Sequence, residues 1–263
     1  MTPYRAKKRL GQNFLKSPEI TQRIIELVNP EPNDLIIEIG PGRGALTRKL
    51  AESKARVVAV EFDRDLIGYL RKLAKRFGNV EVVPQDFLTF EPPPEKFKLV
   101  GNLPFNITSP VIEWAQQYRE SIAQACLMVQ KEMARRLGSS PGSRDWSPLA
   151  IFTRLSFAVE VCFDVSPRHF TPPPKVTSTV VRLWPRQKVE VSHPDRFEKL
   201  VRLSFKQRRK TLLNNLLGEL PVKREVMTEI LGEAGLDQRS RAEHVTIEQF
   251  LQLTNVLVGR NIL

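Results

Sequence analysis

Residues that cross-link a chain or bind metals are scarce in this sequence. It has two cysteines, Cys126 and Cys162, both within apolar runs, and three scattered histidines. Cysteines of this kind are typical of buried thiols in a reducing compartment, and the histidines have no metal-ligand spacing with them. We therefore expect inert, unpaired thiols, no structural metal and a cytoplasmic protein.

Long apolar runs are absent as well. The sequence has no stretch of about 18 apolar residues, the length that a membrane-spanning helix requires. The N-terminal residues MTPYRAKKRLGQNF are basic, but they lack the apolar core and the small-residue cleavage site of a signal peptide. We do not expect a transit peptide either, because this stretch continues into residues with a predicted function. No membrane partner is expected.

Acidic residues are outnumbered by basic ones. The chain has 41 Lys and Arg residues against 29 Asp and Glu residues, a net charge of +12. This excess favours a polyanionic partner, either nucleic acid or an anionic membrane surface. The charge is concentrated in residues 5–9 and 196–210. One such cluster is equally consistent with a solvated helix face, but two favour phosphate contacts. The best candidates are Arg208, Arg209 and Lys210, followed by Lys7, Lys8 and Arg9.

Residues 35–184 alternate short apolar runs with amphipathic stretches. Runs at 35–39, 56–61, 80–83, 97–100 and 125–130 have the composition of buried strands, and the segments between most of them have helical spacing. This alternation predicts an α/β fold, a parallel sheet with helices on both faces. The runs LSFAVEVCFDVSP and KVTSTVVRLWP follow without a helix between them, so we expect an antiparallel pair that completes the sheet.

The composition changes after Pro185. Helical apolar stripes follow, first with Phe197, Leu200, Val201 and Phe205 and then with a group of leucines. We therefore predict an α/β domain over residues 1–187, with 1–34 as an N-terminal extension, and a small helical domain over 188–263. The stretch GSSPGSRDWS at 138–147 is expected to be a mobile loop.

Three glycines separate the first predicted strand from its helix. They are Gly40, Gly42 and Gly44 in IIEIGPGRGALT. A dinucleotide fingerprint would need a glycine where Ala45 stands, so the pattern suits a nucleoside ligand without a pyrophosphate. The absent side chains let the backbone approach such a ligand, and the helix N-terminus adds a partial positive charge. An ordinary strand-to-helix turn is the alternative.

Acids follow the next two strands. Glu61 ends the second strand, where it is placed to accept ribose hydroxyls, and Asp86 follows the third, where it could accept an adenine amino group. Taken singly, they could equally be a solvated acid and a helix N-cap. Their order along one edge of the sheet, where ligands of such folds bind, favours S-adenosylmethionine as the cofactor.

The fourth strand is followed by GNLPFN at 101–106. The Asn102 side-chain oxygen and the Leu103 carbonyl can accept the two N–H bonds of a target adenine amine. Pro104 stiffens the turn, and Phe105 can stack on a flipped-out base. The alternative is a tight turn whose aromatic ring fills the core.

Several blocks together resemble one family, the ribosomal RNA adenine N6,N6-dimethyltransferases of the small-subunit type. The blocks are KKRLGQNFL, EIGPGRGALT, VEFD, QDF, NLPFNIT, FTPPPKVTSTVVRL and FKQRRKTLLNNL. The resemblance implies a Rossmann-like class I methyltransferase fold with a seven-stranded, mostly parallel sheet and a small all-α C-terminal domain. It implies N6,N6-dimethylation of two adjacent adenosines near the 3′ end of small-subunit ribosomal RNA, with S-adenosylhomocysteine as product, during ribosome biogenesis.

The resemblance also implies roles for particular residues. Asn13 and Leu15 would lie against the methionine part of the cofactor, with Gln12 nearby, and Phe170 would face Phe105 across the base. The cofactor contacts implied at the strand ends are Gly40, Gly42, Glu61, Asp86 and Asn102. Two positions depart from the family pattern: Phe105 stands where Tyr is usual, and Thr177, next to Ser178, stands where an acid is common.

Three rival functions share parts of this pattern. A large-subunit adenine methyltransferase has the same kind of NLPF loop, and an adenine-N6 DNA methyltransferase uses a similar one. A binding or assembly factor could keep the fold without the chemistry. The basic block at 205–216 favours the small-subunit enzyme over the first two. We expect direct displacement at the methyl group, which requires no general base because the methylated aminium is acidic; the sequence offers no candidate histidine for that role. A monomer is expected, because no heptad seam is present.

Overall fold

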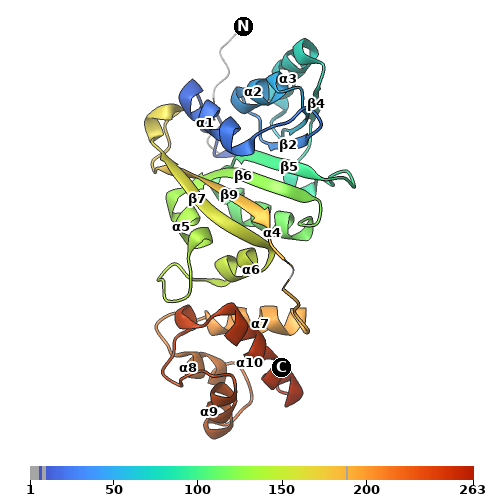
Figure 1. The fold of residues 1–263 in the computed structure, drawn as a ribbon. Helices are drawn as coiled ribbons and strands as arrows, with labels where there is room; N and C mark the ends of the chain where they lie inside the picture. Colours follow the sequence, from blue (N-terminus) through green and yellow to red (C-terminus); the bar gives the residue numbers. More distant parts are fainter. Residues whose placement is uncertain (1–5, 8–9, 188) are drawn as a thin grey trace. The chain divides into compact units, whose positions relative to one another are not determined.

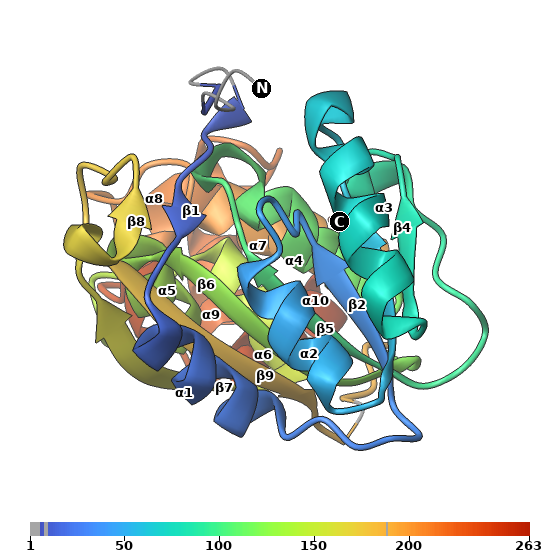
Figure 2. The same cartoon turned by 90° about the horizontal axis from the view of Figure 1, so that it is seen from above.

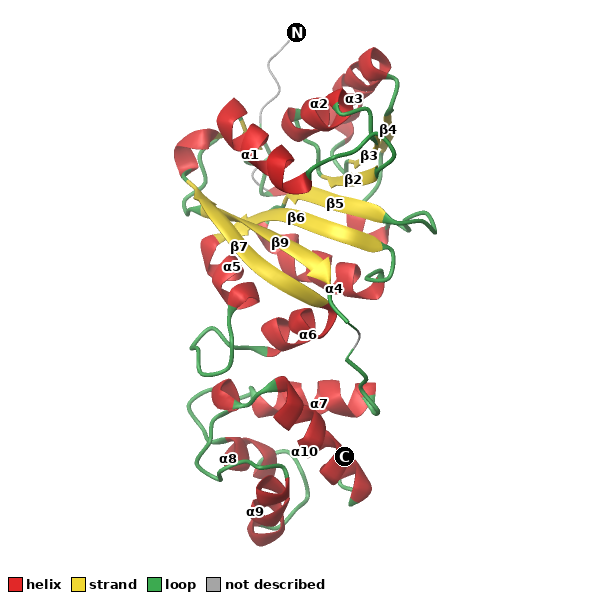
Figure 3. Cartoon of the chain, in the orientation of Figure 1, coloured by secondary structure: helices red, strands yellow, loops and turns green. Residues whose placement is uncertain are grey.

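A seven-stranded sheet organises the first part of the chain. In the computed structural model, which describes residues 6–7, 10–187 and 189–263, the strand order is β4-β3-β2-β5-β6-β9-β7 (Figure 3). The strands are β2 (Leu35–Ile39), β3 (Arg56–Val60), β4 (Val80–Val83), β5 (Phe97–Asn102), β6 (Ile122–Gln130), β7 (Phe157–Val165) and β9 (Ser178–Pro185). The pairs among β2 to β6 are parallel, and β9 is antiparallel to both of its neighbours. The predicted fold class is confirmed.

Helices cover both faces of this sheet. They are α1 (Pro18–Val28), α2 (Ala45–Glu52), α3 (Arg64–Phe77) and α4 (Thr108–Gln117), and α4 lies on the opposite face from α1 and α2 (Figure 1). Apolar residues of α1 and α2, among them Ile24 and Leu50, pack with Ile36 and Val100 of the sheet. On the other face Trp114 of α4 packs against Phe97 and Phe87. Both layers are therefore held by buried apolar contacts.

A second, two-stranded sheet joins segments that are distant in sequence. β1 (Phe14–Leu15) pairs antiparallel with β8 (Phe170–Thr171), and the two lie side by side in Figure 2. Lys16 continues the contact, because its N–H donates to the His169 carbonyl at 2.9 Å. This pairing ties the N-terminal segment to the loop after β7. Short 3-10 helices occupy Phe87–Thr89, Phe105–Ile107 and Pro167–His169.

The chain divides into two units that differ from the predicted domains. The first unit contains Met1–Arg135 and Phe157–Arg186, and the second contains Arg136–Ser156 and Gln187–Leu263. The boundary expected after residue 187 lies within one residue of the observed one. Residues 136–156, however, were expected in the first domain. They belong to the second unit because Trp146, Ala150 and Ile151 are buried in the apolar core of its helices.

The second unit is helical. Helix α5 (Lys131–Gly138) leads into it, and its own helices are α6 (Pro148–Ser156), α7 (Pro194–Ser204), α8 (Leu212–Leu217), α9 (Arg224–Glu233) and α10 (Ile247–Gly259), with a 3-10 turn at Ala242–His244. The loop at 138–147 is anchored, since Trp146 is buried and its Nε1 donates to the Val245 carbonyl at 3.0 Å. Across the described residues, no helix combines the length and apolarity needed to cross a bilayer.

Candidate active site

A cavity of about 260 Å³ opens at the carboxyl edge of the parallel strands. It is lined by the N-terminal segment 10–15, by the turns after β2, β3, β4 and β5, and by residues near β8. All the residues predicted to bind the cofactor or act in catalysis line it: Gln12, Asn13, Leu15, Gly40, Gly42, Glu61, Asp86, Asn102, Leu103, Pro104, Phe105 and Phe170. The structure therefore brings these residues to one place, and their individual roles stay predictions.

The glycine turn has a conformation that side chains rarely adopt. Gly40 and Gly42 both have φ of 58°. A Cβ at Gly42 would stand 2.9 Å from Cδ1 of Phe14, so the turn and the N-terminal segment are in close contact. A Cβ at Gly40 would meet no atom within 4 Å. The backbone at Gly40 thus has open space for a ligand beside it.

Glu61 connects the glycine turn to the start of α3. Its Oε2 accepts the Gly42 N–H at 3.0 Å, and its Oε1 accepts the Asp63 N–H at 2.8 Å. Burial raises the pKa of Glu61, and the two backbone donors act in the opposite direction. An ionised carboxylate has about four acceptor sites, so these two bonds leave capacity for the predicted ribose contact.

Asp86 is exposed and caps the 3-10 helix that follows it. Its Oδ1 accepts the Leu88 N–H at 3.0 Å. This N-cap is the alternative that the sequence left open for Asp86. The residue also lines the cavity, so the cap and the predicted adenine contact are compatible.

The turn after β5 presents two acceptors. Asn102 Nδ2 donates to the Asn13 carbonyl at 2.9 Å, which orients the side-chain amide. The Leu103 N–H donates to the Met128 carbonyl at 3.0 Å, and the Pro104 carbonyl accepts the Ile107 N–H at 3.2 Å. Within the described part of the chain, no group donates to the Asn102 side-chain oxygen or to the Leu103 carbonyl. Both are therefore available to a substrate amine.

The two predicted stacking rings have different surroundings. Phe105 is partly exposed, in the 3-10 helix that closes the turn. Phe170 is 2% exposed and packs in the apolar core with Leu15. Both line the cavity, together with the buried Ser178. At Thr177, which departs from the family pattern, the backbone carbonyl accepts a hydrogen bond from the Lys131 N–H at 3.1 Å. A clamp between Phe105 and Phe170 stays a prediction, because Phe170 is part of the core.

Sequence reasoning missed Glu38. It lies on β2 with 1% of its surface exposed, and its Oε2 has no hydrogen-bond partner among the described residues. Burial raises the pKa of Glu38 to about 8; the charge of Glu61 adds to the rise, and Thr47 opposes it. Glu38 is among the residues that line the cavity. The only sequence signal is one acid within the otherwise apolar LIIEI, which the parallel-sheet interpretation leaves unexplained.

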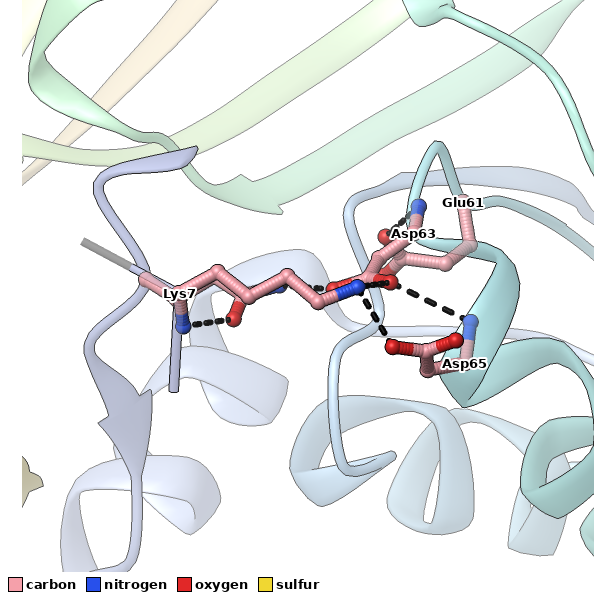
Figure 4. Close-up of polar contacts among 5 residues, drawn as sticks. Lys7, Glu61, Asp63 and Asp65 are labelled. Carbon is pink, nitrogen blue, oxygen red and sulfur yellow. Dashed lines mark hydrogen bonds and ion pairs between the residues drawn. The ribbon is translucent and has the colours of Figure 1, made fainter. Parts of the chain in front are cut away.

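Lys7 was predicted to contact RNA phosphates, but in the structure it is paired with acidic side chains of the protein itself. Its ammonium contacts Asp63 at 2.5 Å and Asp65 at 2.6 Å, so two carboxylates compensate its charge (Figure 4). Gln12 also bonds within the protein, because its Nε2 donates to Asp63 Oδ2 at 2.7 Å. Lys8 and Arg9 lie outside the described residues.

The second basic cluster lies in the turn between α7 and α8. Arg208, Arg209 and Lys210 are exposed there, in the second unit, and do not line the cavity. Arg208 donates to the Arg144 carbonyl and lies 3.8 Å from a Glu243 oxygen. The loop at 138–147 therefore adds Arg144 to this basic surface. The described residues contain no group of three or more His, Cys, Asp or Glu side chains placed to bind a metal.

Comparison with known proteins gives a consistent result. Residues 4–258 match the family model for ribosomal RNA adenine dimethylase. The chain is 39% identical to the ribosomal RNA small subunit methyltransferase A of Saccharophagus degradans, with 98% of this chain and 96% of the relative covered. The corresponding protein of Francisella tularensis subsp. novicida is 38% identical, with 96% and 98% covered.

Solved structures agree with the fold. The chain resembles the dimethyladenosine transferase of Plasmodium falciparum with a TM-score of 0.83 and 27% identity, covering 95% of this chain and 98% of that one. It resembles the 23S rRNA methyltransferase ErmE with a TM-score of 0.74 and 35% identity, covering 94% and 100%. The family match over nearly the whole chain, together with these relatives, places this protein in the ribosomal RNA adenine dimethylase family.

Proposed function

We propose that this protein dimethylates the N6 amines of two adjacent adenosines near the 3′ end of small-subunit ribosomal RNA. The reaction would take place in the cytoplasm during assembly of the subunit, with the protein acting as a monomer. The observation that carries the proposal is the pair of available acceptors, the Asn102 side-chain oxygen and the Leu103 carbonyl, on the wall of the cavity. The names of the curated relatives support the small subunit as the source of the RNA.

The cavity fits S-adenosylmethionine. Open space lies beside the Gly40 backbone, and Glu38 lines the cavity with one buried oxygen that has no hydrogen-bond partner among the described residues. Glu61 would hold the ribose, Asp86 the adenine amino group, and the segment with Asn13 and Leu15 the methionine part. When bound, the cofactor would supply a sulfonium methyl group, whose transfer to the target nitrogen would exchange a C–S bond for a C–N bond and give S-adenosylhomocysteine.

The acceptors activate the amine through its geometry. The lone pair of the adenine N6 is delocalised into the ring, so the amine is a poor nucleophile. Hydrogen bonds from its two N–H groups to Asn102 and Leu103 favour a pyramidal nitrogen with a localised lone pair. The hydrogen bond to the Asn13 carbonyl holds the Asn102 amide in the required orientation. Catalysis rests on positioning, and the methylated nitrogen releases its proton to solvent without a general base.

The large subunit is the second candidate source of the RNA, because ErmE, named a 23S rRNA methyltransferase, shares the fold at 35% identity. The test is methyl transfer from labelled S-adenosylmethionine to unmethylated small subunits, large-subunit RNA and duplex DNA, with the product nucleoside identified by mass. Dimethyladenosine in small-subunit RNA alone is the expected result. Methylation of large-subunit RNA or DNA instead would refute the substrate assignment.

The variant Asn102→Ala separates catalysis from binding. It removes one of the two acceptors, so the methyl-transfer rate should fall by about a hundredfold or more. Affinity for the small subunit should not change. Asn255→Ala, at an exposed position on α10, serves as the control and should keep the wild-type rate. If the wild-type protein and Asn102→Ala both bound the small subunit but neither transferred a methyl group, the protein would be a binding factor.

A further inference from the structure

Asp63 lies at the centre of a polar cluster beside the cavity. It follows Glu61 by two residues and is the N-cap of α3. Its side chain is 1% exposed, although the nearby Lys7 and Asp65 side chains reach solvent. Figure 4 shows Lys7 extending from the N-terminal segment across to the start of α3. The proposed reaction assigns no role to Asp63.

Donors from two separate segments converge on this carboxylate. Lys7 Nζ donates to Oδ1 at 2.5 Å, and Gln12 Nε2 donates to Oδ2 at 2.7 Å. The Asp65 N–H donates to Oδ1 at 3.1 Å, which is the helix cap. A buried carboxylate requires such donors, because a buried charge without partners is strongly unfavourable.

Gln12 is held at both ends of its amide. Its Nε2 bonds to Asp63, and its Oε1 accepts the Lys7 N–H at 2.8 Å. The amide is thus engaged within the protein, so Gln12 acts on a ligand through the position of its neighbours. Those neighbours, Leu10 to Leu15, form one wall of the cavity.

Asp63 also fixes the opposite wall. Its N–H donates to Glu61 Oε1 at 2.8 Å, and Glu61 Oε2 accepts the Gly42 N–H at 3.0 Å. A continuous chain of hydrogen bonds therefore runs from Lys7 and Gln12 through Asp63 and Glu61 to the glycine turn. A displacement of Asp63 would move both walls of the cavity.

We propose that Asp63 is a positioning residue for the cofactor and that Lys7 and Gln12 act through it. The Asp63 carboxylate holds the cavity-lining segment Leu10–Leu15 against the start of α3, and its N–H holds Glu61 in the orientation that receives the ribose. This inference rests on the proposed cofactor site. It gives Lys7 a role inside the protein in place of a contact to RNA.

The alternative is that Asp63 only caps α3. The variant Asp63→Asn distinguishes the two roles, because Asn is as good an N-cap as Asp. The Asn amide keeps one acceptor but replaces the other with an N–H₂ group. It therefore cannot accept from both Lys7 and Gln12. Lys7→Met tests the same contact from the other side, and it does not alter the helix cap.

The experiment is titration calorimetry of the full-length protein with S-adenosylmethionine. Asp63→Asn and Lys7→Met should each raise the Kd about five- to tenfold, as expected when a charged hydrogen bond that pre-organises a site is lost. The double variant should bind no more weakly than the weaker single variant, since both remove one contact. Lys7→Arg should restore much of the affinity. Lys49→Met, which breaks the exposed Lys49–Glu52 ion pair on α2, is the matched control and should keep the wild-type Kd.

A second readout separates positioning from general destabilisation. In steady-state assays the KM for S-adenosylmethionine should rise while the KM for the RNA substrate stays constant, and Lys7→Met should remain fully folded at the assay temperature. Wild-type affinity in Lys7→Met and Asp63→Asn would overturn the inference, as would Kd increases that multiply in the double variant. No binding of S-adenosylmethionine to the wild type would instead refute the cofactor site itself.

Discussion

Replacement of Glu38 by Gln should change the pH dependence of stability. Glu38 is 1% exposed on β2, and one of its oxygens has no partner among the described residues. Burial raises its pKa from 4.5 to about 8. The folded protein therefore holds this carboxyl protonated at neutral pH, whereas the unfolded chain releases the proton. Gln has nearly the same shape and cannot ionise, so it isolates the effect of the proton.

The sign follows from linkage. Because the pKa is higher in the folded state, the contribution of Glu38 to the free energy of unfolding is fully present below pH 4.5 and is lost as the pH rises to about 8. The loss is about 1.4 kcal/mol for each pH unit inside that window. Between pH 5.5 and 8 the wild type should therefore lose about 3 kcal/mol relative to Glu38→Gln.

Urea unfolding of both proteins at pH 5.5 and pH 8 measures this difference. The other titrating groups are common to both proteins, so their contributions to the free energy of unfolding cancel in the comparison. The direct check is a ¹³C NMR titration of the glutamate carboxyl carbons, in which the resonance absent from Glu38→Gln should titrate near pH 8. An equal stability difference at the two pH values, or titration of that resonance near its ordinary value, would refute the reasoning.

Three further predictions concern the glycine turn, the basic turn and the thiols. Gly42→Ala should weaken S-adenosylmethionine binding several-fold in equilibrium dialysis, because φ is 58° there and a Cβ would stand 2.9 Å from the Phe14 ring; unchanged affinity would contradict this account. Alanine at residues 208–210 together should lower RNA affinity and reduce the slope of log K against log salt by about two, since each phosphate contact adds about 0.7 to 0.9. An unaltered slope would remove these residues from the interface. Burial raises the pKa of Cys126 to about 12, so a thiol reagent should label the partly exposed Cys162 first. Mass spectrometry would show the order of labelling, and early labelling of Cys126 would argue against its burial.

The sheet and its ligand edge were predictable because their signals are local. Apolar runs at 35–39 and 97–100 correspond to β2 and to most of β5, and a glycine turn or polar turn follows each. Carboxyl ends of parallel strands meet at one edge, so residues such as Glu61 and Asn102 could be grouped without coordinates. The structure places them on one cavity. The periodicity of the apolar runs and the topology of parallel sheets were together sufficient to predict the sheet and the grouping of these residues.

Long-range pairings could not be predicted in this way. β1 and β8 have two residues each and are separated by most of the α/β unit, so neither has a periodic signal. The apolar face of α6 indicates burial but not which core receives it, and Ile151 packs with the C-terminal helices. Lys7 was grouped with basic neighbours by sequence, while one of its partners in the structure, Asp63, is 56 positions away. Each of these features depends on a partner that sequence proximity does not identify.

The two proposed ligands make opposite electrostatic demands on one chain. Among the described residues that line the cavity, Glu61 and Asp86 are acidic, Glu38 is held protonated at neutral pH, and Arg43 is basic, although the chain carries a net charge of +12. Acidic groups suit a cofactor with a sulfonium, and they repel phosphates most strongly where water is excluded. A neutral adenine base can enter such a cavity at little electrostatic cost, whereas the charged phosphate groups of the RNA backbone are repelled from it. The phosphates must therefore be bound elsewhere, which is the role that the basic turn in the second unit suits.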